Sequence, residues 1–193
     1  MTVFDVGVIH GRFQVLHNDH LKYLLAGKAM CRHLVIGITN PDPVLTNCVE
    51  VDLKRSETLA NPMTYYERLV MVREVMAEAG LTREDLTITP LPITRPELYK
   101  YYVPMDGLFM LSIYDDWGRQ KLSQFRKMGL KTHVLWEVRP EEKGISSADV
   151  RELMIRDKPW EHLIPKSAVE VLKIWDIAAR LKAIKEQEDK KRQ

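Results

Sequence analysis

Short apolar runs alternate with helix-forming segments along most of the chain, and this alternation leaves very few folds open. Five runs are rich in β-branched and aliphatic residues, and several are apolar almost without a break, which is typical of strands covered on both faces. Strand, helix and strand repeated in this way predict a parallel sheet with right-handed crossovers. We therefore expect a doubly wound α/β fold with C-terminal helices. The expected strands are residues 3–10, 33–39, 86–93, 107–113 and 131–138.

The segments between the runs place apolar residues three and four apart, and two of them carry helix signals. Thr64 and Glu67 form a capping box at the start of one helix. Asp115 or Asp116 can cap the next one, and Gly129 ends it. The expected helices are residues 20–29, 65–79, 117–128, 147–156 and 166–184, and residues 40–62 are expected to be a loop, either a lid over the site or an uninvolved surface excursion.

The composition suits a soluble domain and argues against several partners. At 193 residues the chain is long enough for one domain, which we expect at residues 1–184, followed by a charged tail at 185–193. The formal net charge of +2 gives no bulk attraction to nucleic acid or membrane. No apolar stretch approaches the roughly 20 residues of a membrane span, and the two cysteines show no disulfide framework. We expect a cytoplasmic protein without a nucleic-acid or membrane partner.

The stretch GVIHGRFQVLHNDHLKYLL, residues 7–25, places two histidines three residues apart where a strand turns into a helix. His17 and His20 lack the further ligands of a metal site and any nucleophile in a GxSxG turn. They can also be two packed core side chains. The phosphate interpretation explains more residues, because Gly11 lets the backbone approach a ligand, Arg12 adds a cation, and the first helical turn offers N–H groups to an anion.

A second cluster, ISSADVR at residues 145–151, has a similar character. Ser146 and Ser147 stand at the start of a helix, with Arg151 one turn further on. Serine hydroxyls, helix N–H groups and an arginine make an anion cradle, although an N-cap serine beside a surface arginine is the simpler alternative. The two clusters follow the first and fifth expected strands. If these strands are neighbours, both clusters meet over a single polyphosphate.

These residues carry a family resemblance. GRFQVLHNDH, residues 11–20 and hereafter the histidine motif, resembles the GRFQPxHxGH signature of the HxGH nucleotidyltransferase superfamily. ISSADVR, hereafter the serine motif, resembles its ISSTxxR signature. ANPMTYYERLVMV at 60–72 and DKPWEHLIPKSAVEVL at 157–172 are similar to segments of archaeal-type nicotinamide-nucleotide adenylyltransferases. The resemblance covers roughly residues 4–180 and implies a Rossmann-like nucleotidyltransferase fold.

The resemblance implies that a substrate phosphate attacks the α-phosphate of ATP and releases pyrophosphate. The acceptor would be nicotinamide or nicotinate mononucleotide, the product a dinucleotide, and Mg²⁺ would accompany the triphosphate without a dedicated metal site in the protein. An ionised phosphate needs no catalytic base, so positioning and charge stabilisation are what the protein supplies. The implied site comprises catalytic His17, His20 and Arg151, nucleotide-binding Gly11, Arg12, Phe13, Ser146 and Ser147, and substrate-binding Asn40, Tyr101 and Tyr102.

The sequence departs from the family pattern at three positions. Val15 stands in place of Pro, Asp19 in place of Gly, and Ala148 in place of Thr. We expect Asp19 to be a helix-start acid that points away from the phosphates, the alternative being contact with Mg²⁺. The segment 93–104 falls where the relatives recognise nicotinamide mononucleotide, but it lacks their Asp and Trp and offers tyrosines, which can stack on a ring or lie buried in the core.

Two rival functions remain open at this stage. The first is the same chemistry with another phosphomonoester or with CTP. The second is a non-catalytic, nucleotide-binding regulatory protein, in which Asp19 and Ala148 mark a decayed site, although His17, His20 and Arg151 are intact. The expected partners are ATP, a small phosphomonoester and further copies of the chain in a homo-oligomer.

Overall fold

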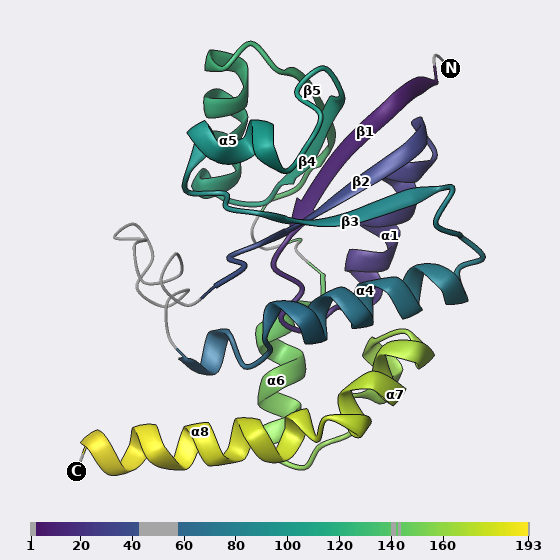
Figure 1. Cartoon of the computed structure of the whole chain (residues 1–193). Coiled ribbons are helices and arrows are strands. Elements are labelled where there is room, and N and C mark those ends of the chain that lie inside the picture. Colours follow the sequence, from purple (N-terminus) through teal and green to yellow (C-terminus); the bar gives the residue numbers. More distant parts are fainter. Residues whose placement is uncertain (1–2, 43–57, 140–141, 143, 193) are drawn as a thin grey trace.

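A computed structural model describes residues 3–42, 58–139, 142 and 144–192 (Figure 1). Its strands form one five-stranded parallel sheet in the order β3-β2-β1-β4-β5, flanked by helices. The predicted doubly wound fold is therefore confirmed. The strands are β1 (Phe4–Gly11), β2 (Cys31–Thr39), β3 (Leu86–Leu91), β4 (Leu108–Ile113) and β5 (Lys131–Glu137).

The helices begin largely where the sequence signals place them. Thr64 and Glu67 make both bonds of their capping box, and Asp115 rather than Asp116 caps the next helix by accepting a bond from the N–H of Gly118. The helices are α1 (Asn18–Lys28), α4 (Tyr65–Glu78), α5 (Asp116–Lys127), α6 (Ser147–Ile155), α7 (Lys166–Ile174) and α8 (Ile177–Arg192), with short 3₁₀ turns η1 (Thr58–Ala60), η2 (Pro96–Tyr101) and η4 (Glu161–Leu163).

One expected helix is two helices. Residues 166–184 were predicted as a single segment, but the chain turns between α7 and α8 at Asp176, whose φ of 46° lies in the left-handed region. Asp tolerates this conformation better than most residues, and the apolar spacing continues across it, so periodicity alone does not reveal the turn. Beyond it, α8 runs to Arg192 and includes most of the predicted tail.

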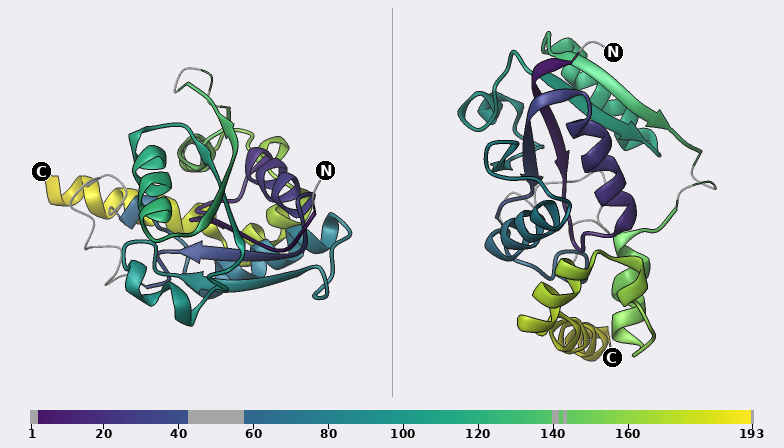
Figure 2. Two further views of the ribbon diagram at one scale, coloured as in Figure 1. Left: turned by 90° about the horizontal axis from the view of Figure 1, so that it is seen from above. Right: turned by 90° about the vertical axis from the view of Figure 1, so that its right-hand side faces the viewer.

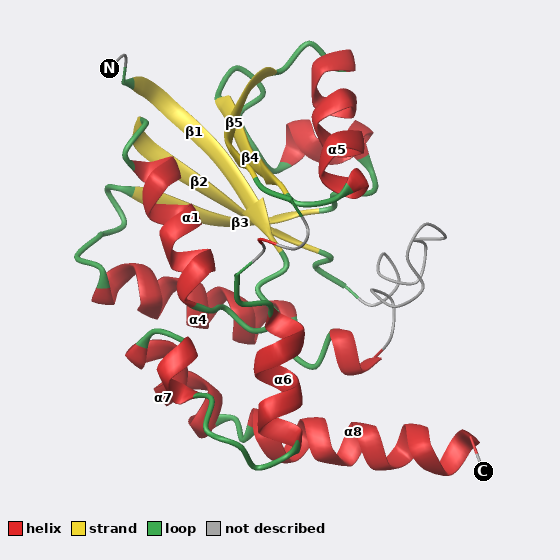
Figure 3. Ribbon diagram, turned by 180° about the vertical axis from the view of Figure 1, so that it is seen from behind, coloured by secondary structure: helices red, strands yellow, loops and turns green. Residues whose placement is uncertain are grey.

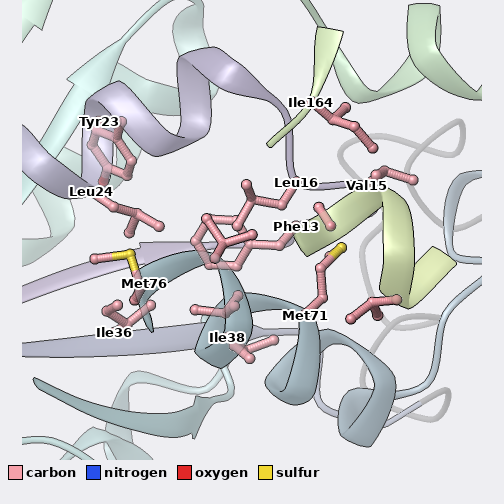
Figure 4. Close-up of a cluster of buried hydrophobic side chains, with 14 of the residues drawn as sticks. Phe13, Val15, Leu16, Tyr23, Leu24, Ile36, Ile38, Met71, Met76 and Ile164 are labelled. Carbon is pink, nitrogen blue, oxygen red and sulfur yellow. The ribbon is translucent and has the colours of Figure 1, made fainter. Parts of the chain in front are cut away.

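Helices cover both faces of the sheet (Figures 2 and 3). One face packs against α1 and α4, and the same core continues into α6, α7 and α8. The other face packs against α5 and η2, where Phe125 and Tyr99 are fully buried. The histidine motif enters the first core through Phe13, Val15 and Leu16, which Figure 4 shows among side chains of β2 and α4.

The strand order places a natural crevice at the centre of the sheet. β1 lies between β2 and β4 and runs parallel to both. The connections that follow β1 and β4 pass to opposite faces, since α1 covers one face and α5 the other. In open α/β sheets a ligand binds at such a point, beyond the carboxyl ends of the strands. β4 separates β1 from β5, so the first and fifth strands are not neighbours and cannot by themselves bring the two motifs together.

Two further findings bear on the sequence predictions. No helix in the described ranges is long and apolar enough to cross a membrane. Of the predicted loop at 40–62, residues 43–57 lie outside the described residues, so its suggested role as a lid stays a prediction.

Candidate active site

A cavity of about 700 Å³ opens at the carboxyl ends of β1 and β4. Residues of the histidine motif and of the serine motif line it together, although more than a hundred residues separate them in the chain. From the predicted site, the cavity is lined by Arg12, Phe13, His17, His20, Asn40, Ser146, Ser147 and Arg151. The two motifs thus meet, but through the path of the chain after β5 rather than through adjacent strands.

The two histidines stack on each other at the start of α1. Their ring centroids lie 3.7 Å apart at an interplanar angle of 26°. The backbone N–H of His20 donates to Nδ1 of His17 at 3.4 Å, and the N–H of His17 donates to Nδ1 of His20 at the same distance. Because Nδ1 accepts in both rings, each neutral ring carries its proton on Nε2. Two N–H donors on stacked rings suit the oxygens of one phosphate group.

Gly11 and Phe13 shape the turn between β1 and α1. Phe13 has a φ of 52°, and its ring folds back over Gly11, where a Cβ would lie only 2.6 Å from the Phe13 Cζ atom. The same ring meets His20 edge to face with centroids 5.2 Å apart. Gly11 was expected to shape the pocket by letting backbone approach a ligand. In the structure it does not line the cavity, and it gives room to the Phe13 ring that supports His20.

The serine motif docks directly onto the histidine motif. Ser147 Oγ donates to the carbonyl of Val15 at 2.7 Å, and Arg151 Nη1 donates to the carbonyl of Gln14. Burial lowers the pKa of Arg151 to about 10, so the guanidinium is still charged at neutral pH. Ser146 acts as the N-cap of α6 and shares a capping box with Asp149. The helix start, Ser147 and Arg151 therefore line the same cavity as the two histidines.

Asp19 connects the two motifs. Its Oδ2 accepts from the backbone N–H of Ile145 at 2.8 Å, and its Oδ1 accepts from Lys22 Nζ at 3.0 Å. Partial burial alone would raise the pKa of this carboxyl, but the bonds from Lys22 and Ile145 outweigh burial and lower it. Asp19 lies in the first turn of α1, as expected of a helix-start acid, but it does not point away from the site. His17 is the N-cap of α1, and Asp19 lines the cavity and holds the loop before α6.

We expect Asp19→Ala to raise the KM for nucleotide several-fold and to lower the free energy of unfolding by about 1 kcal/mol, because a charge-assisted hydrogen bond to the α6 loop is lost. Steady-state kinetics and urea unfolding measure the two effects. Asp5→Ala, which removes an exposed carboxylate at the start of β1, is the control and should change neither. A large increase in the Mg²⁺ concentration needed by Asp19→Asn would instead identify Asp19 as a metal ligand.

Arg68 does not line the cavity, but it holds in place three residues that do. Its side chain is 2% exposed and donates from Nη1 to the carbonyls of Arg12 and Thr39 at 2.9 and 2.7 Å, and from Nη2 to that of Asn40 at 2.7 Å. The guanidinium thus ties the turn after β1 to the end of β2. Burial lowers its pKa to about 10. The one sequence signal for Arg68 is its place in the segment 60–72, which resembles a segment of archaeal-type nicotinamide-nucleotide adenylyltransferases.

Tyr101 and Tyr102, expected to contact the acceptor, do not line the cavity. Both lie at the end of η2, and their side chains are 70% and 39% exposed. The tyrosine of this segment that turns inward is Tyr99, which is fully buried and donates to the carbonyl of Ile93 at 2.7 Å. The 3₁₀ geometry of η2 brings one of the three tyrosines into the core and leaves the other two at the surface.

His10 and Lys121 line the cavity beside α5, and neither belongs to the histidine motif or the serine motif. His10 ends the apolar run of β1, and Lys121 projects from α5 so that its Nζ lies 3.4 Å from His10 Nε2.

The part of the chain that the structure describes holds no group of three His, Cys, Asp or Glu side chains suited to a metal ion. The metal interpretation of the paired histidines gains no support from these residues.

Known proteins that are similar in sequence to this chain are nucleotidyltransferases. The family model described as cytidylyltransferase-like matches residues 8–153. A phosphonoformate cytidylyltransferase of Streptomyces viridochromogenes is 46% identical over 181 residues, covering 94% of this chain and 97% of that protein. A nicotinamide-nucleotide adenylyltransferase of Thermococcus sibiricus is 31% identical over 174 residues, covering 86% of this chain and 82% of that protein.

Solved structures share the fold. A bifunctional NMN adenylyltransferase/ADP ribose pyrophosphatase from Francisella tularensis superposes with a TM-score of 0.67 at 18% identity, over 94% of this chain and 53% of that one. The chain thus spans about half of that larger protein. A putative nicotinate-nucleotide adenylyltransferase from Vibrio parahaemolyticus superposes with a TM-score of 0.56 at 14% identity. At these identities the likeness concerns the fold alone.

Proposed function

The chain belongs to the cytidylyltransferase-like family, and we propose that it transfers CMP from CTP to a small phosphonate acid such as phosphonoformate, releasing pyrophosphate. The observation that carries nucleotidyl transfer is that two stacked histidines and the start of α6 line one and the same cavity. The choice of CTP and a small phosphonate is supported by the 46% identity to phosphonoformate cytidylyltransferase along nearly the full length of both chains.

The chemistry proceeds in one displacement at the α-phosphorus of the nucleotide. An ionised phosphonate oxygen of the acceptor forms the new O–P bond, the bond from the α-phosphorus to the bridging oxygen breaks, and pyrophosphate leaves with the electron pair. No side chain has to remove a proton. The Nε2–H groups of His17 and His20 would donate to the α-phosphate oxygens, where negative charge builds up in the transition state. Arg151 and the N–H groups at the start of α6 would hold the β- and γ-phosphates.

Mg²⁺ fits this arrangement as a companion of the triphosphate. It is commonly bound by substrate phosphates with few protein ligands. Both oxygens of Asp19 accept hydrogen bonds from Ile145 and Lys22, so we assign the ion's ligands to the phosphate oxygens and to water. Bound there, it would neutralise charge on the leaving pyrophosphate.

Adenylyl transfer from ATP to nicotinamide mononucleotide is the second candidate. It is favoured by relatives of about 30% identity that cover 86% of the chain. The two tyrosines expected to stack on the pyridine ring lie outside the cavity, which weakens the case for nicotinamide mononucleotide as the acceptor. Adenylyl transfer to this mononucleotide stays a prediction.

A panel of four substrate pairs separates the candidates. The protein would be incubated with Mg²⁺ and either CTP or ATP, each with phosphonoformate or nicotinamide mononucleotide, and pyrophosphate release followed. We expect the highest rate with CTP and phosphonoformate. Release only with ATP and the mononucleotide would favour the second candidate, and no release from any pair would favour the non-catalytic nucleotide-binding protein.

We expect Arg151→Ala to weaken nucleoside triphosphate binding about tenfold to a hundredfold, because a buried, charge-assisted contact to phosphate is removed. Isothermal calorimetry with Mg-CTP measures the change in Kd. Arg156→Ala is the matched control, since Arg156 caps the other end of α6 and pairs with Glu152 at the surface. An unchanged Kd for a folded Arg151→Ala protein would contradict the placement of the triphosphate.

A further inference from the structure

The cavity reaches from one face of the sheet to the other. At the histidine and serine motifs it is bounded by α1 and α6, whose buried residues Leu24 and Val150 belong to one core cluster. At the other end it is bounded by α5, whose Phe125 belongs to the second cluster. The groups proposed to hold the triphosphate gather at the α1 and α6 end, so the α5 end is available to the rest of the nucleotide and to the part of the acceptor that does not react.

At the α5 end of the cavity, the ammonium group of Lys121 contacts the neutral side chain of His10. An ammonium group only donates hydrogen bonds, so in the 3.4 Å contact between Lys121 Nζ and His10 Nε2 the histidine nitrogen accepts. The proton of His10 then lies on Nδ1, which is buried and has no hydrogen-bond partner among the residues that the structure describes. Burial, and secondarily the charge of Lys121, hold the pKa of His10 well below its usual value. His10 therefore orients the ammonium without adding charge or cancelling it.

The surroundings keep this pair in place. His10 packs edge to face on Phe125 with centroids 5.5 Å apart, and Lys121 Nζ lies 6.0 Å from the centre of the Trp117 ring. Both Lys121 and Trp117 line the cavity. A buried imidazole in the central strand is a costly way to fill a core position, since an apolar side chain needs no partner for a ring N–H. Its placement beside a cavity lysine indicates a role in the site.

On the basis of the proposed function, we propose that Lys121, positioned by His10, binds the second anionic group of the acceptor. Phosphonoformate carries a carboxylate beside its phosphonate. With the phosphonate directed at the nucleotide between the two motifs, the carboxylate is the group left to face α5. A lysine is a compact point charge on a flexible stem and suits a small carboxylate. The contact selects acceptors that carry a second acid group over phosphonates that lack one.

The test compares two acceptors in two proteins. Lys121→Met should raise the KM for phosphonoformate at least about tenfold, the effect expected for a lost charge-assisted hydrogen bond, and should leave the KM for CTP nearly unchanged. With the carboxyl methyl ester of phosphonoformate, the same substitution should have little effect. Lys127→Met, at the end of α5 and outside the cavity, is the matched control. Equal losses for the acid and the ester, or no loss for either, would overturn the proposal.

His10 is tested through its effect on Lys121. His10→Leu should raise the KM for phosphonoformate, and His10→Gln, whose amide oxygen can accept from the ammonium, should restore part of it. In a background that already carries Lys121→Met, His10→Leu should have no further effect on this KM. Additive effects of the two substitutions would overturn the positioning role, because independent residues give independent losses.

A binding measurement keeps this inference separate from the proposed function. Calorimetry with phosphonoformate alone needs no turnover. Weaker binding to Lys121→Met than to wild type supports the subsite even if the four substrate pairs give no pyrophosphate. The absence of pyrophosphate would contradict only the proposed reaction. Equal binding to both, or no binding to wild type, overturns the subsite even if pyrophosphate is released. Lys121→Gln replaces Lys121→Met if the latter does not fold.

Discussion

Replacing His20 by Ala is expected to lower kcat by about a hundredfold or more, because one N–H donor to the reacting phosphate is lost in the transition state. The KM for nucleotide should change much less, since Arg151 and the start of α6 remain. The structure also predicts a small cost in stability, below about 1 kcal/mol, because His20 contributes one long bond of 3.4 Å to the cap of α1. Single-turnover kinetics at saturating CTP and phosphonoformate measure the chemical step directly.

A surface histidine provides the control for this experiment. His133 lies on the edge strand β5, is exposed and does not line the cavity, so His133→Ala should retain the wild-type rate. A His20→Ala enzyme within about threefold of wild type would exclude His20 from the transition state. Loss of a stoichiometric transition metal together with the histidine would instead revive the metal interpretation.

Arg68→Met is expected to destabilise the protein by about 3 kcal/mol or more, the largest stability effect that we predict for a single side chain here. The substitution preserves an apolar stem but leaves the carbonyls of Arg12, Thr39 and Asn40 without their donor. Each buried acceptor that loses its partner carries a desolvation cost of about 1–3 kcal/mol, part of which water can offset. Urea unfolding followed by circular dichroism measures the change.

The same helix supplies the control for Arg68. Arg73 also lies on α4, but its side chain is 58% exposed and pairs with Glu74 at the surface. Arg73→Met should shift the free energy of unfolding by no more than about 0.5 kcal/mol. If both variants unfold at the same urea concentration, the bridge from Arg68 to the three carbonyls does not contribute to stability as we infer.

Local signals made the elements predictable. The capping box of Thr64 and Glu67 and the cap at Asp115 act within a few residues, and they operate in the structure as the sequence indicates. The apolar runs of β1 and β2 are buried because helices cover both faces of the sheet. The histidine motif and the serine motif were recognisable because each concentrates its polar groups in a short stretch at the start of a helix.

Features that depend on topology were not predictable in this way. The sequence does not state that β4 lies between β1 and β5, because strand order is decided by which crossovers pack best. His10 and Lys121 are 111 residues apart and meet only because α5 covers the face to which His10 points. The left-handed turn at Asp176 breaks the helix, although the apolar spacing of the sequence continues across it. For Tyr101 and Tyr102, the family resemblance indicated contact with the acceptor or burial in the core, and only the path of η2 determines which ring of this segment turns inward.

The bonds that join α6 to the start of α1 also set the order in which the site matures during synthesis. They connect residues 126, 132 and 137 positions apart, from Asp19 to Ile145, Val15 to Ser147 and Gln14 to Arg151. At translation rates of about 5–20 residues per second, Gln14, Val15 and Asp19 precede their partners by roughly 6–27 s. A nascent chain can therefore build most of the sheet while it still lacks a nucleotide pocket. Nucleotide then binds only chains that have closed this long loop, and by binding them it stabilises the closed state.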